Sequence, residues 1–317
     1  MRGIFIVKRI YFVLASLVLI SLTACGQQID KTSQSNEVSQ STSVQIETEE
    51  SDKELPYQSV IAGTSSVAEY LAEFEIPVVG VTDQDGIPTM YNDSERVGQP
   101  RQLNMEKVVS LEPDLFIGDQ ALAELSQQAM ADQSIETVYL NNSSYEGILT
   151  SIEQIGKIFH KEDQAKEIVA DLQKQEMDAL SGIEKLKGKK LAVLFGTGES
   201  YKLATKNSYL GSLLEKLGVD NVADKIAQAP RPYVDFSLET VVAENPDYIL
   251  TLAHGHKEQA AQAFKAEMQK ELWQQTTAVQ ENHTYALDDK TYPVTGNIHV
   301  IDTLANLKNL LLDGSPE

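Results

Sequence analysis

The sequence predicts an α/β protein of two lobes, with parallel sheets joined by one long α-helix and a ligand cleft between the lobes. Three observations lead to this prediction. Apolar runs of strand length alternate with helical patterns in both halves of the chain, which is typical of parallel sheets. A sixteen-residue segment occurs once in each half. Between the two copies lies a charged, proline-free stretch whose apolar residues recur at helical spacing.

The repeated segment covers residues 103–118 and residues 236–251. Each copy begins with a helix-capping residue, Asn104 or Ser237, and an acidic residue two places later complements the helix dipole. Proline disfavours helical backbone for the residue before it, so each helix should end before Pro-Asp and lead into a buried strand. The aligned copies are identical at five positions: Glu106/Glu239, Val108/Val241, Val109/Val242, Pro113/Pro246 and Asp114/Asp247.

The carboxyl ends of the two repeated strands predict where a ligand binds. In open α/β sheets, ligands sit in the crevice beyond these ends. Two copies that face each other would form one cleft. Gly118-Asp119 would lie on one wall and residues 253–256, Ala-His-Gly-His, on the other.

Length and charge limit the classes of partner. A chain of 317 residues is long enough for two domains. It carries 26 Lys and Arg against 47 Asp and Glu, a net charge of −21, whereas nucleic-acid binding requires a basic surface. A small anionic ligand responds to local charge and is compatible with this composition. The single cysteine excludes a disulfide or a cysteine-based metal cluster within one chain.

Residues 1–24 are predicted to be a secretory signal peptide. Lys8 and Arg9 precede the apolar run 10–22, which is far shorter than the ~20 residues of a membrane-spanning helix. The run ends in Leu-Thr-Ala-Cys25-Gly, which resembles the lipobox of bacterial lipoproteins, so Cys25 is expected to be lipidated. The alternative is a plain signal peptide with an incidental cysteine. Residues 25–54 are polar and acidic, and are expected to form a disordered tether.

The first lobe is predicted over residues 55–160. Its expected strands are 58–63, 77–81, 115–117 and 137–140, and its expected helices are 66–74, 121–133 and 144–159, with a polar loop over 83–99.

The connecting helix is predicted over residues 161–187. Apolar residues recur at helical spacing up to Ile183, although Gly182 weakens the last turns. A single helix would act as a stiff strut that allows a small rocking motion. Two helices with a break are the alternative, and would change only the stiffness.

The second lobe is predicted over residues 188–317. A strand over 190–195 is followed by a glycine turn, Gly196-Thr-Gly198, which lacks the ending and spacing of a phosphate loop. The other expected elements are a helix over 209–217, the second repeat copy, a helix over 257–270, a strand over 284–287 and a final amphipathic helix over 298–312.

The sequence contains no recognisable catalytic motif, and an enzyme is therefore the minority interpretation. Two histidines, His254 and His256, follow the second repeated strand, where the cleft is expected. Histidine is a common ligand of transition metals and haem iron. The other three histidines are interpreted as structural: His160, His283 and His299.

Further candidate ligand-binding residues lie on both walls. Arg101, just before the first repeat copy, could hold carboxylates or other anionic groups with its guanidinium, or could be an ordinary surface arginine. Met105 and Met90 are possible thioether ligands, although Met105 is equally a packing residue. Small or aromatic residues complete the set: Thr64 and Ser65 at a helix start, and Tyr201, Tyr209 and Tyr292 as pocket walls.

The chain after the tether resembles the substrate-binding lipoproteins of iron-chelate ABC importers, a class with two Rossmann-like lobes joined by a single backbone helix. Within that class the likeness is strongest to the haem receptors of Gram-positive bacteria, of the IsdE and HtsA type. It covers roughly residues 57–310 and is carried by these segments: Pro77-Val-Val-Gly80, Val97-Gly-Gln-Pro100, Ser200–Thr205, Ser208–Gly211, Asn245–Gly255, Leu272-Trp273 and Asn282–Tyr285.

The resemblance implies that the iron of haem is held by a histidine after the second-lobe strand, which His254 matches, and by a methionine just after Gly-Gln-Pro. Arg101 occupies that methionine position here. Haem binding through His254 alone, or with Met105 as the second ligand, is one interpretation and is favoured. A ferric siderophore that contacts Arg101 is the other.

The resemblance also implies a partner. In such receptors one glutamate per lobe docks onto arginines of a dimeric permease that works with an ATPase, and Glu106 and Glu239 match these positions. The expected protein is a monomer held by lipid at Cys25 on the extracellular face of the cell membrane, with no catalytic cofactor. A surface adhesin or sensor without transport, and an enzyme on the same scaffold, are the other hypotheses.

Overall fold

The computed structural model describes residues 55–196, 201–227, 230–253 and 257–314, which belong to one compact unit. The signal peptide 1–24, the predicted lipidation site Cys25, the tether and the two histidines His254 and His256 lie outside the described residues. No helix within the described ranges is both long and apolar enough to cross a membrane.

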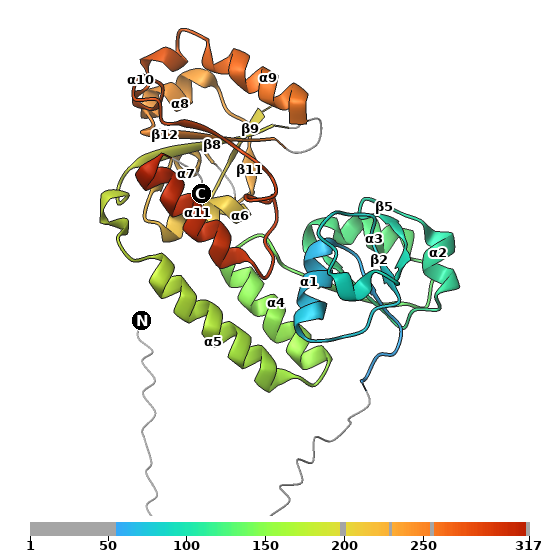
Figure 1. Ribbon diagram of the computed structural model, residues 1–317. Helices are drawn as coiled ribbons and strands as arrows, with labels where there is room; N and C mark the ends of the chain where they lie inside the picture. Colours follow the sequence, from blue (N-terminus) through green and yellow to red (C-terminus); the bar gives the residue numbers. More distant parts are fainter. Residues whose placement is uncertain (1–54, 197–200, 228–229, 254–256, 315–317) are drawn as a thin grey trace, which may run out of the picture. The chain divides into compact units, whose positions relative to one another are not determined.

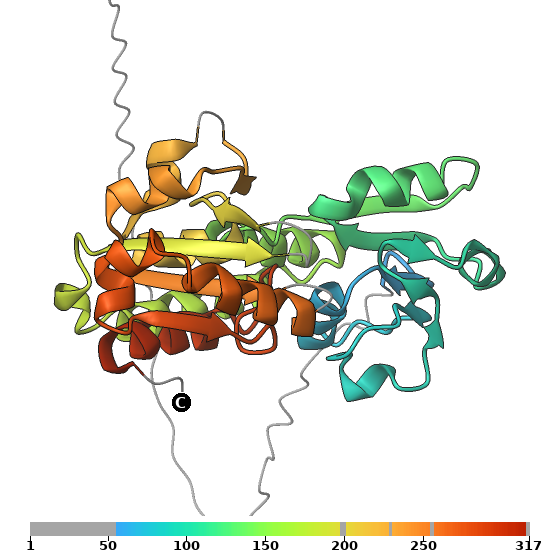
Figure 2. The ribbon, with the colours of Figure 1, turned by 90° about the horizontal axis from the view of Figure 1, so that it is seen from above.

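The first lobe is a five-stranded parallel sheet with strand order β3-β2-β1-β6-β7 and helices on both faces (Figures 1 and 2). Successive residues of a strand point to opposite faces, and the two central strands are buried on both. The elements are β1 Val60–Ala62, α1 Ser65–Glu73, β2 Gly80–Val81, η1 Thr89–Tyr91, β3 Glu95–Arg96, α2 Met105–Ser110, β6 Leu115–Asp119, η2 Gln120–Leu122, α3 Ala123–Ala129, β7 Glu136–Leu140 and α4 Tyr145–Ile158.

Short strands that the sequence did not predict lie in the loop over 83–99 and directly after it. β3 extends the sheet at its edge, and β4 Gly98–Gln99 pairs with β5 Gln102–Leu103 in an antiparallel hairpin. Each has only two residues, which is too short for an alternating pattern to be visible in the sequence.

The second lobe has a six-stranded sheet with the order β11-β9-β8-β12-β13, to which β10 adds by pairing with β8. Strands β8, β10, β12 and β13 are parallel, whereas β9 runs in the opposite direction and pairs antiparallel with both β8 and β11. The expected parallel sheet forms the core of this lobe, and β9 is the one strand among the described residues that runs against it. The elements are β8 Lys190–Gly196, β9 Tyr201–Ala204, α6 Tyr209–Lys216, β10 Asp220–Asn221, α7 Val222–Ile226, β11 Tyr233–Val234, α8 Leu238–Glu244, β12 Tyr248–Ala253, α9 Lys257–Met268, η4 Trp273–Gln275, α10 Thr277–Gln280, β13 Thr284–Leu287 and α11 Val300–Asp313.

The sequence repeat is also a structural repeat. Asn104 accepts a hydrogen bond from the N–H three residues on, and so does Ser237, so each caps its helix as predicted. Each helix is followed by a residue with left-handed backbone at the same repeat position, Glu112 at φ 46° and Asn245 at φ 49°. The chain then enters β6 or β12, the strand that pairs with β1 or β8 in its own sheet.

One of the five identical pairs in the repeat, Asp114/Asp247, has a structural explanation. The Asp114 carboxylate accepts hydrogen bonds from the N–H groups of Gln58 and Ser59 at 2.7 and 3.1 Å, just before β1. Asp247 likewise accepts from the N–H of Lys190 at 2.8 Å, at the start of β8. Each aspartate thus holds the beginning of the neighbouring parallel strand, which is a structural role.

The connecting helix α5, Glu162–Ala179, is shorter than the predicted 161–187. The chain turns at Gly182, which has a left-handed φ of 80°, and then forms the short helix η3, Ile183–Lys185. At the start of α5, Lys161 Nζ donates a hydrogen bond to the carbonyl of Phe74 at 2.7 Å, next to the end of α1. Eighteen residues span about 27 Å, and α5 runs from this contact to the second lobe.

Lys216 fastens α6 of the second lobe to α4 and α5. Its Nζ lies 2.8 Å from a carboxylate oxygen of Glu146 on α4 and 2.8 Å from one of Glu176 on α5. It also sits 4.1 Å from the ring centroid of Tyr145. Burial lowers the pKa of Lys216, but the two carboxylates outweigh this effect and raise it overall. The side chain is only 18 % exposed, so the ion pairs are partly shielded from water.

We expect Lys216→Met to destabilise the protein by about 2 kcal/mol, because it leaves the mostly buried Glu176 carboxylate without its cation. Lys166→Met is the matched control, since its pair with Asp163 is exposed on the surface of α5 and should contribute almost nothing. Urea unfolding followed by circular dichroism measures both. Equal midpoints for the two variants would contradict this role of Lys216.

Candidate ligand-binding site

The parallel strands of the first sheet end at one edge, where the sequence predicts one wall of the site. Thr64 Oγ1 accepts a hydrogen bond from the Val67 N–H at 3.2 Å, so this hydroxyl caps α1. The Ser65 N–H donates to Gln84 Oε1 at 2.9 Å. Both predicted ligand residues therefore order the loop at the sheet edge. The half-buried Ser65 hydroxyl makes no hydrogen bond within the described ranges and is the freer of the two side chains.

Arg101 lies at the exposed tip of the β4–β5 hairpin. The hairpin is held in place, since the Asp83 N–H donates to the Gly98 carbonyl at 2.9 Å and Gln99 Nε2 donates to the Asp83 carbonyl at 2.7 Å. Gly98 has φ 92°, and a side chain there would come within 2.8 Å of the Asn104 nitrogen. The hairpin thus presents the Arg101 side chain from a fixed backbone.

A second arginine, Arg96, ends β3 at the same edge and was missed by sequence reasoning. Its Nη1 donates to the Thr82 carbonyl at 3.2 Å. Neither Arg96 nor Arg101 forms an ion pair with a described residue, although the chain as a whole is strongly acidic. Arg96 gave no signal because it follows Glu95 in a polar stretch that the sequence predicts as loop.

Met105, the other predicted ligand on this wall, is the first residue of α2 and is half-buried. It packs against a cluster that contains Val108 of α2 and Phe116 of β6. Its side chain therefore contributes to packing, which was the alternative considered for it.

The second wall is expected at the ends of β8 and β12. These strands run parallel, and Ala253, the last residue of β12, pairs with Gly196, the last residue of β8. In the sequence His254 comes directly after Ala253 and His256 two residues later; both lie outside the described residues.

An aromatic pair lies at this end of the second sheet. Tyr201 opens β9, and its ring centroid is 4.7 Å from that of Phe264 on α9. A side chain on Gly196 would come within 2.7 Å of the Phe264 ring, so glycine is needed for this close approach. Tyr201 is half-buried, in keeping with a pocket wall, whereas Phe264 is buried and was not recognised from the sequence.

Tyr209 and Tyr292 are core residues, and the expectation that they form pocket walls does not fit the structure. Each is 1 % exposed, and burial raises the pKa of both phenols. Tyr209 lies beneath Gly296, whose added side chain would meet its ring at 2.5 Å. Tyr292 Oη donates to the carbonyl of Asn306 on α11 at 3.4 Å.

Asp119 was also expected on a cleft wall, but it is 5 % exposed. One carboxylate oxygen accepts from the Ala121 N–H and the other from Asn142 Nδ2, both at 2.8 Å. Burial raises the pKa of Asp119, although these two hydrogen bonds oppose the increase. Its oxygens are occupied by protein donors, so it orders the strand end rather than contacting a ligand.

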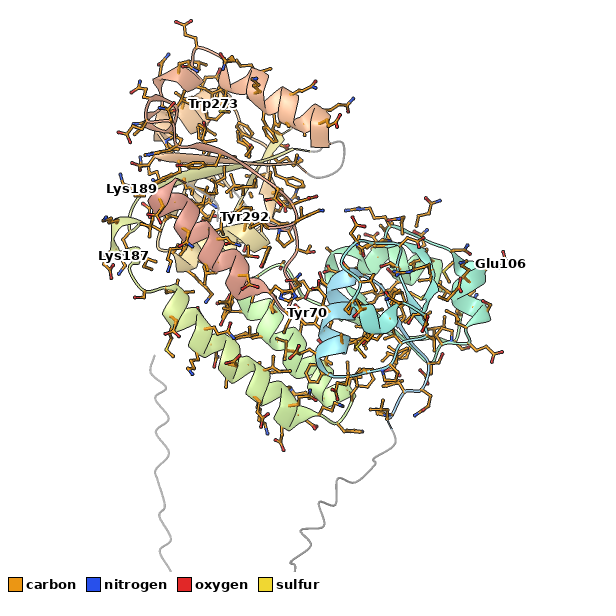
Figure 3. All side chains as sticks on the ribbon, in the orientation of Figure 1. Tyr70, Glu106, Lys187, Lys189, Trp273 and Tyr292 are labelled. Carbon is orange, nitrogen blue, oxygen red and sulfur yellow. The ribbon has the colours of Figure 1, made fainter. Side chains whose placement is uncertain are left out.

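Glu106 and Glu239 are exposed in the first turns of α2 and α8 and form no ion pair with any described residue. Figure 3 shows Glu106 at the outer side of α2. They occupy matching positions in the two lobes, as the repeat predicts.

Among the hollows lined by described residues, one lies away from the predicted ligand-binding side chains, and another includes Ala253 of the predicted second wall and Phe264 beside Tyr201. One, of about 400 Å³, lies between α1, α5 and the start of α11. The other, of about 320 Å³, lies between α9 and the strands β12 and β13. No group of three or more His, Cys, Asp or Glu residues in the described ranges could hold a bare metal ion.

Two α/β lobes joined through one long helix, with candidate ligand residues at the carboxyl ends of both sheets, define a two-lobed binding protein. The chain belongs to the periplasmic binding protein family, whose profile matches residues 60–291.

Individual members of the family are also similar to this chain. The high-affinity heme uptake system protein IsdE of Staphylococcus aureus is 29 % identical over 255 residues, which are 79 % of this chain and 86 % of that protein. The crystal structure of S. aureus IsdE complexed with heme has a TM-score of 0.73 at 28 % identity, and covers 80 % of this chain and 98 % of that one. An ABC transporter substrate-binding protein from Listeria monocytogenes EGD-e has a TM-score of 0.74 at 25 % identity, with coverage of 80 % and 98 %.

A more distant structure shows the same fold. The triscatecholate siderophore binding protein FeuA from Bacillus subtilis, complexed with ferri-bacillibactin, has a TM-score of 0.66 at 20 % identity and covers 81 % of this chain and 93 % of that one.

Proposed function

We propose that this protein is the substrate-binding component of an ABC importer, and that it captures an iron chelate, with haem as the favoured ligand. The similarity to IsdE over most of both chains, including a structure with bound heme, is the observation that carries this proposal. The sequence adds to it, because His254 directly follows Ala253, the last residue of β12. Binding rather than catalysis follows from the family.

A ferric siderophore is the second candidate ligand. Arg101 favours it, since this exposed guanidinium, which forms no ion pair with a described residue, stands where the haem receptors that the chain resembles carry a methionine. Catecholate and carboxylate oxygens are suitable partners for such a group.

The proposal includes attachment and delivery. Cys25 would carry a lipid that anchors the protein at the extracellular face of the membrane, and residues 26–54 would tether the lobes to it. Glu106 and Glu239 would dock onto the dimeric permease.

Titration of the purified protein with haemin tests the ligand. We expect a saturable, intense Soret band and quenching of Trp273, the only tryptophan. Its ring is buried, and its Nε1 donates to Glu267 Oε1 on α9 at 3.1 Å, on the helix that follows His254 and His256 (Figure 3). If haemin gives no saturable change and a ferric catecholate quenches the Trp273 fluorescence, the ligand is a siderophore rather than haem.

Substitution of Arg101 distinguishes further between haem and a siderophore as the ligand. Arg101→Met should strengthen haemin binding by supplying a sulfur ligand, whereas Arg101→Gln, which removes the charge and adds no sulfur, should not. If the ligand is an anionic siderophore, both variants should weaken binding by about 10- to 100-fold, the usual effect of a lost hydrogen bond to a charged group. Equal haemin affinity of all three proteins would show that position 101 does not face the iron.

A further inference from the structure

Asn142 lies where the chain leaves β7 and begins α4, and it is bonded to both lobes. The residue is 1 % exposed. Its Oδ1 accepts a hydrogen bond from Tyr70 Oη at 3.1 Å, and its Nδ2 donates to Asp119 Oδ2 at 2.8 Å, both within the first lobe. Its backbone carbonyl accepts from the Gly296 N–H of the second lobe at 2.8 Å. Tyr70 is labelled in Figure 3.

The side chain of Asn142 has a chemical requirement that few residues meet. Tyr70 needs an acceptor at one end of the side chain, and Asp119 needs a donor at the other. A carboxamide of this length supplies both, whereas an aspartate cannot donate and a leucine can do neither. All three side chains are buried, so a lost partner would leave a polar group without water to replace it.

The partner segment of the second lobe is equally constrained. Gly296 lies so close to α4 and α6 that an added side chain would be 2.4 Å from Ile148 Cδ1 and 2.5 Å from Tyr209 Cε2. The loop backbone is therefore packed between these two helices. Its hydrogen bond to Asn142 joins two well-held segments rather than two mobile ones.

Next to this junction a hollow interrupts the packing of the lobes. The hollow of about 400 Å³ separates α1 of the first lobe from the start of α11 of the second. Its lining is polar on both sides, with Glu73 on α1 and with His299 and Asp302 at the start of α11. Beside this hollow, the lobes are joined by the hydrogen bond from Gly296 to Asn142 and by the ion pair between Lys216 and Glu146.

We propose that Asn142 sets the spacing of the two lobes, and that it is thereby a positioning residue for the chelate-binding cleft. The claim about spacing stands on the contacts above, whereas the claim about the cleft rests on the proposed function. The test below measures the two separately.

The spacing is measured by the distance between spin labels on the two lobes. Gln128 on α3 and Ala243 on α8 are exposed helical positions, one in each lobe, and each is replaced by cysteine. The full chain also carries Cys25→Ser, because Cys25 is its only native cysteine. The parent protein should give one narrow distance distribution without any ligand.

Asn142→Asp should broaden or shift this distribution, because two carboxylates then face each other at position 142 and Asp119. Binding should weaken about tenfold if the binding-competent spacing falls to about a tenth of the population. The exchange variant Asp119→Asn/Asn142→Asp restores a donor and an acceptor with reversed polarity, and should return both spacing and affinity to the parent values. A residue that mattered only for local stability would leave the spacing of a folded single variant unchanged.

A folded Asn142→Asp protein with the parent distance distribution overturns the proposal, and so does an exchange variant that folds with an altered spacing. If neither variant folds, Tyr70→Phe decides, since it removes one hydroxyl only; a broadened distribution supports the proposal and an unchanged one overturns it. These distances are measured without ligand, so failure to bind haemin or a siderophore affects the proposed function alone.

Discussion

His254→Ala should weaken haemin binding by about 2 kcal/mol or more, roughly thirtyfold, and should shift or remove the Soret band. A ligand to the iron is expected to be one of the few residues that carry most of the binding free energy. The position in the sequence fits this role, because His254 comes directly after Ala253, where β12 ends, and α/β proteins bind ligands beyond the carboxyl ends of their strands. Absorption spectroscopy during a haemin titration measures the change.

His283→Ala is the matched control for this experiment. His283 precedes β13, whose first residue pairs with Ile249 near the start of β12, so it lies at the opposite edge of the same sheet. Its ring stacks on Tyr248 at 4.9 Å, which gives it a structural role. We expect its removal to leave the haemin spectrum intact. His256→Ala is the informative third variant, since loss of the band there and not with His254→Ala would move the iron ligand to position 256.

The core of both lobes was predictable because the repeated segment itself marks where its helix begins and where its strand follows. Asn104 and Ser237 mark where the helices begin, and Pro-Asp marks where the strands follow. The left-handed residues Glu112 and Asn245 were not predicted, since glutamate gives no sign that it will adopt a positive φ. The two-residue strands were missed for lack of length rather than for an unusual composition.

The candidate site was less predictable than the fold, because burial depends on segments far away in the sequence. Tyr209 opens a helix next to a loop, which suggests an accessible position, yet the loop around Gly296 covers it. Asn142 stands in the polar stretch Asn-Asn-Ser-Ser, which predicts an exposed turn. Its importance appears only when Tyr70 and Asp119 are brought beside it by α1 and β6.

Replacing Glu106 and Glu239 together by alanine should abolish uptake of the iron chelate by cells while leaving its affinity for the purified protein unchanged. Both carboxylates are exposed and unpaired among the described residues, and the repeat places one on each lobe, as a dimeric permease with one basic surface per subunit would require. Charge pairs at such exposed positions mainly govern encounter rate and register. Within the protein itself, each glutamate complements a helix dipole and stabilises the fold by about 0.3–1 kcal/mol, so the double variant should remain folded.

The control for this double variant is Glu124→Ala/Glu258→Ala. These glutamates also lie exposed in the first turn of a helix, one in each lobe, and so lose the same helix-dipole contribution without belonging to the repeat. Uptake of radiolabelled iron chelate, at matched protein levels, should be normal for the control and absent for Glu106→Ala/Glu239→Ala. Normal uptake by both would leave the repeated glutamates with the helix-dipole role alone, and an equal loss in both would point to overall surface charge rather than to docking at these two positions.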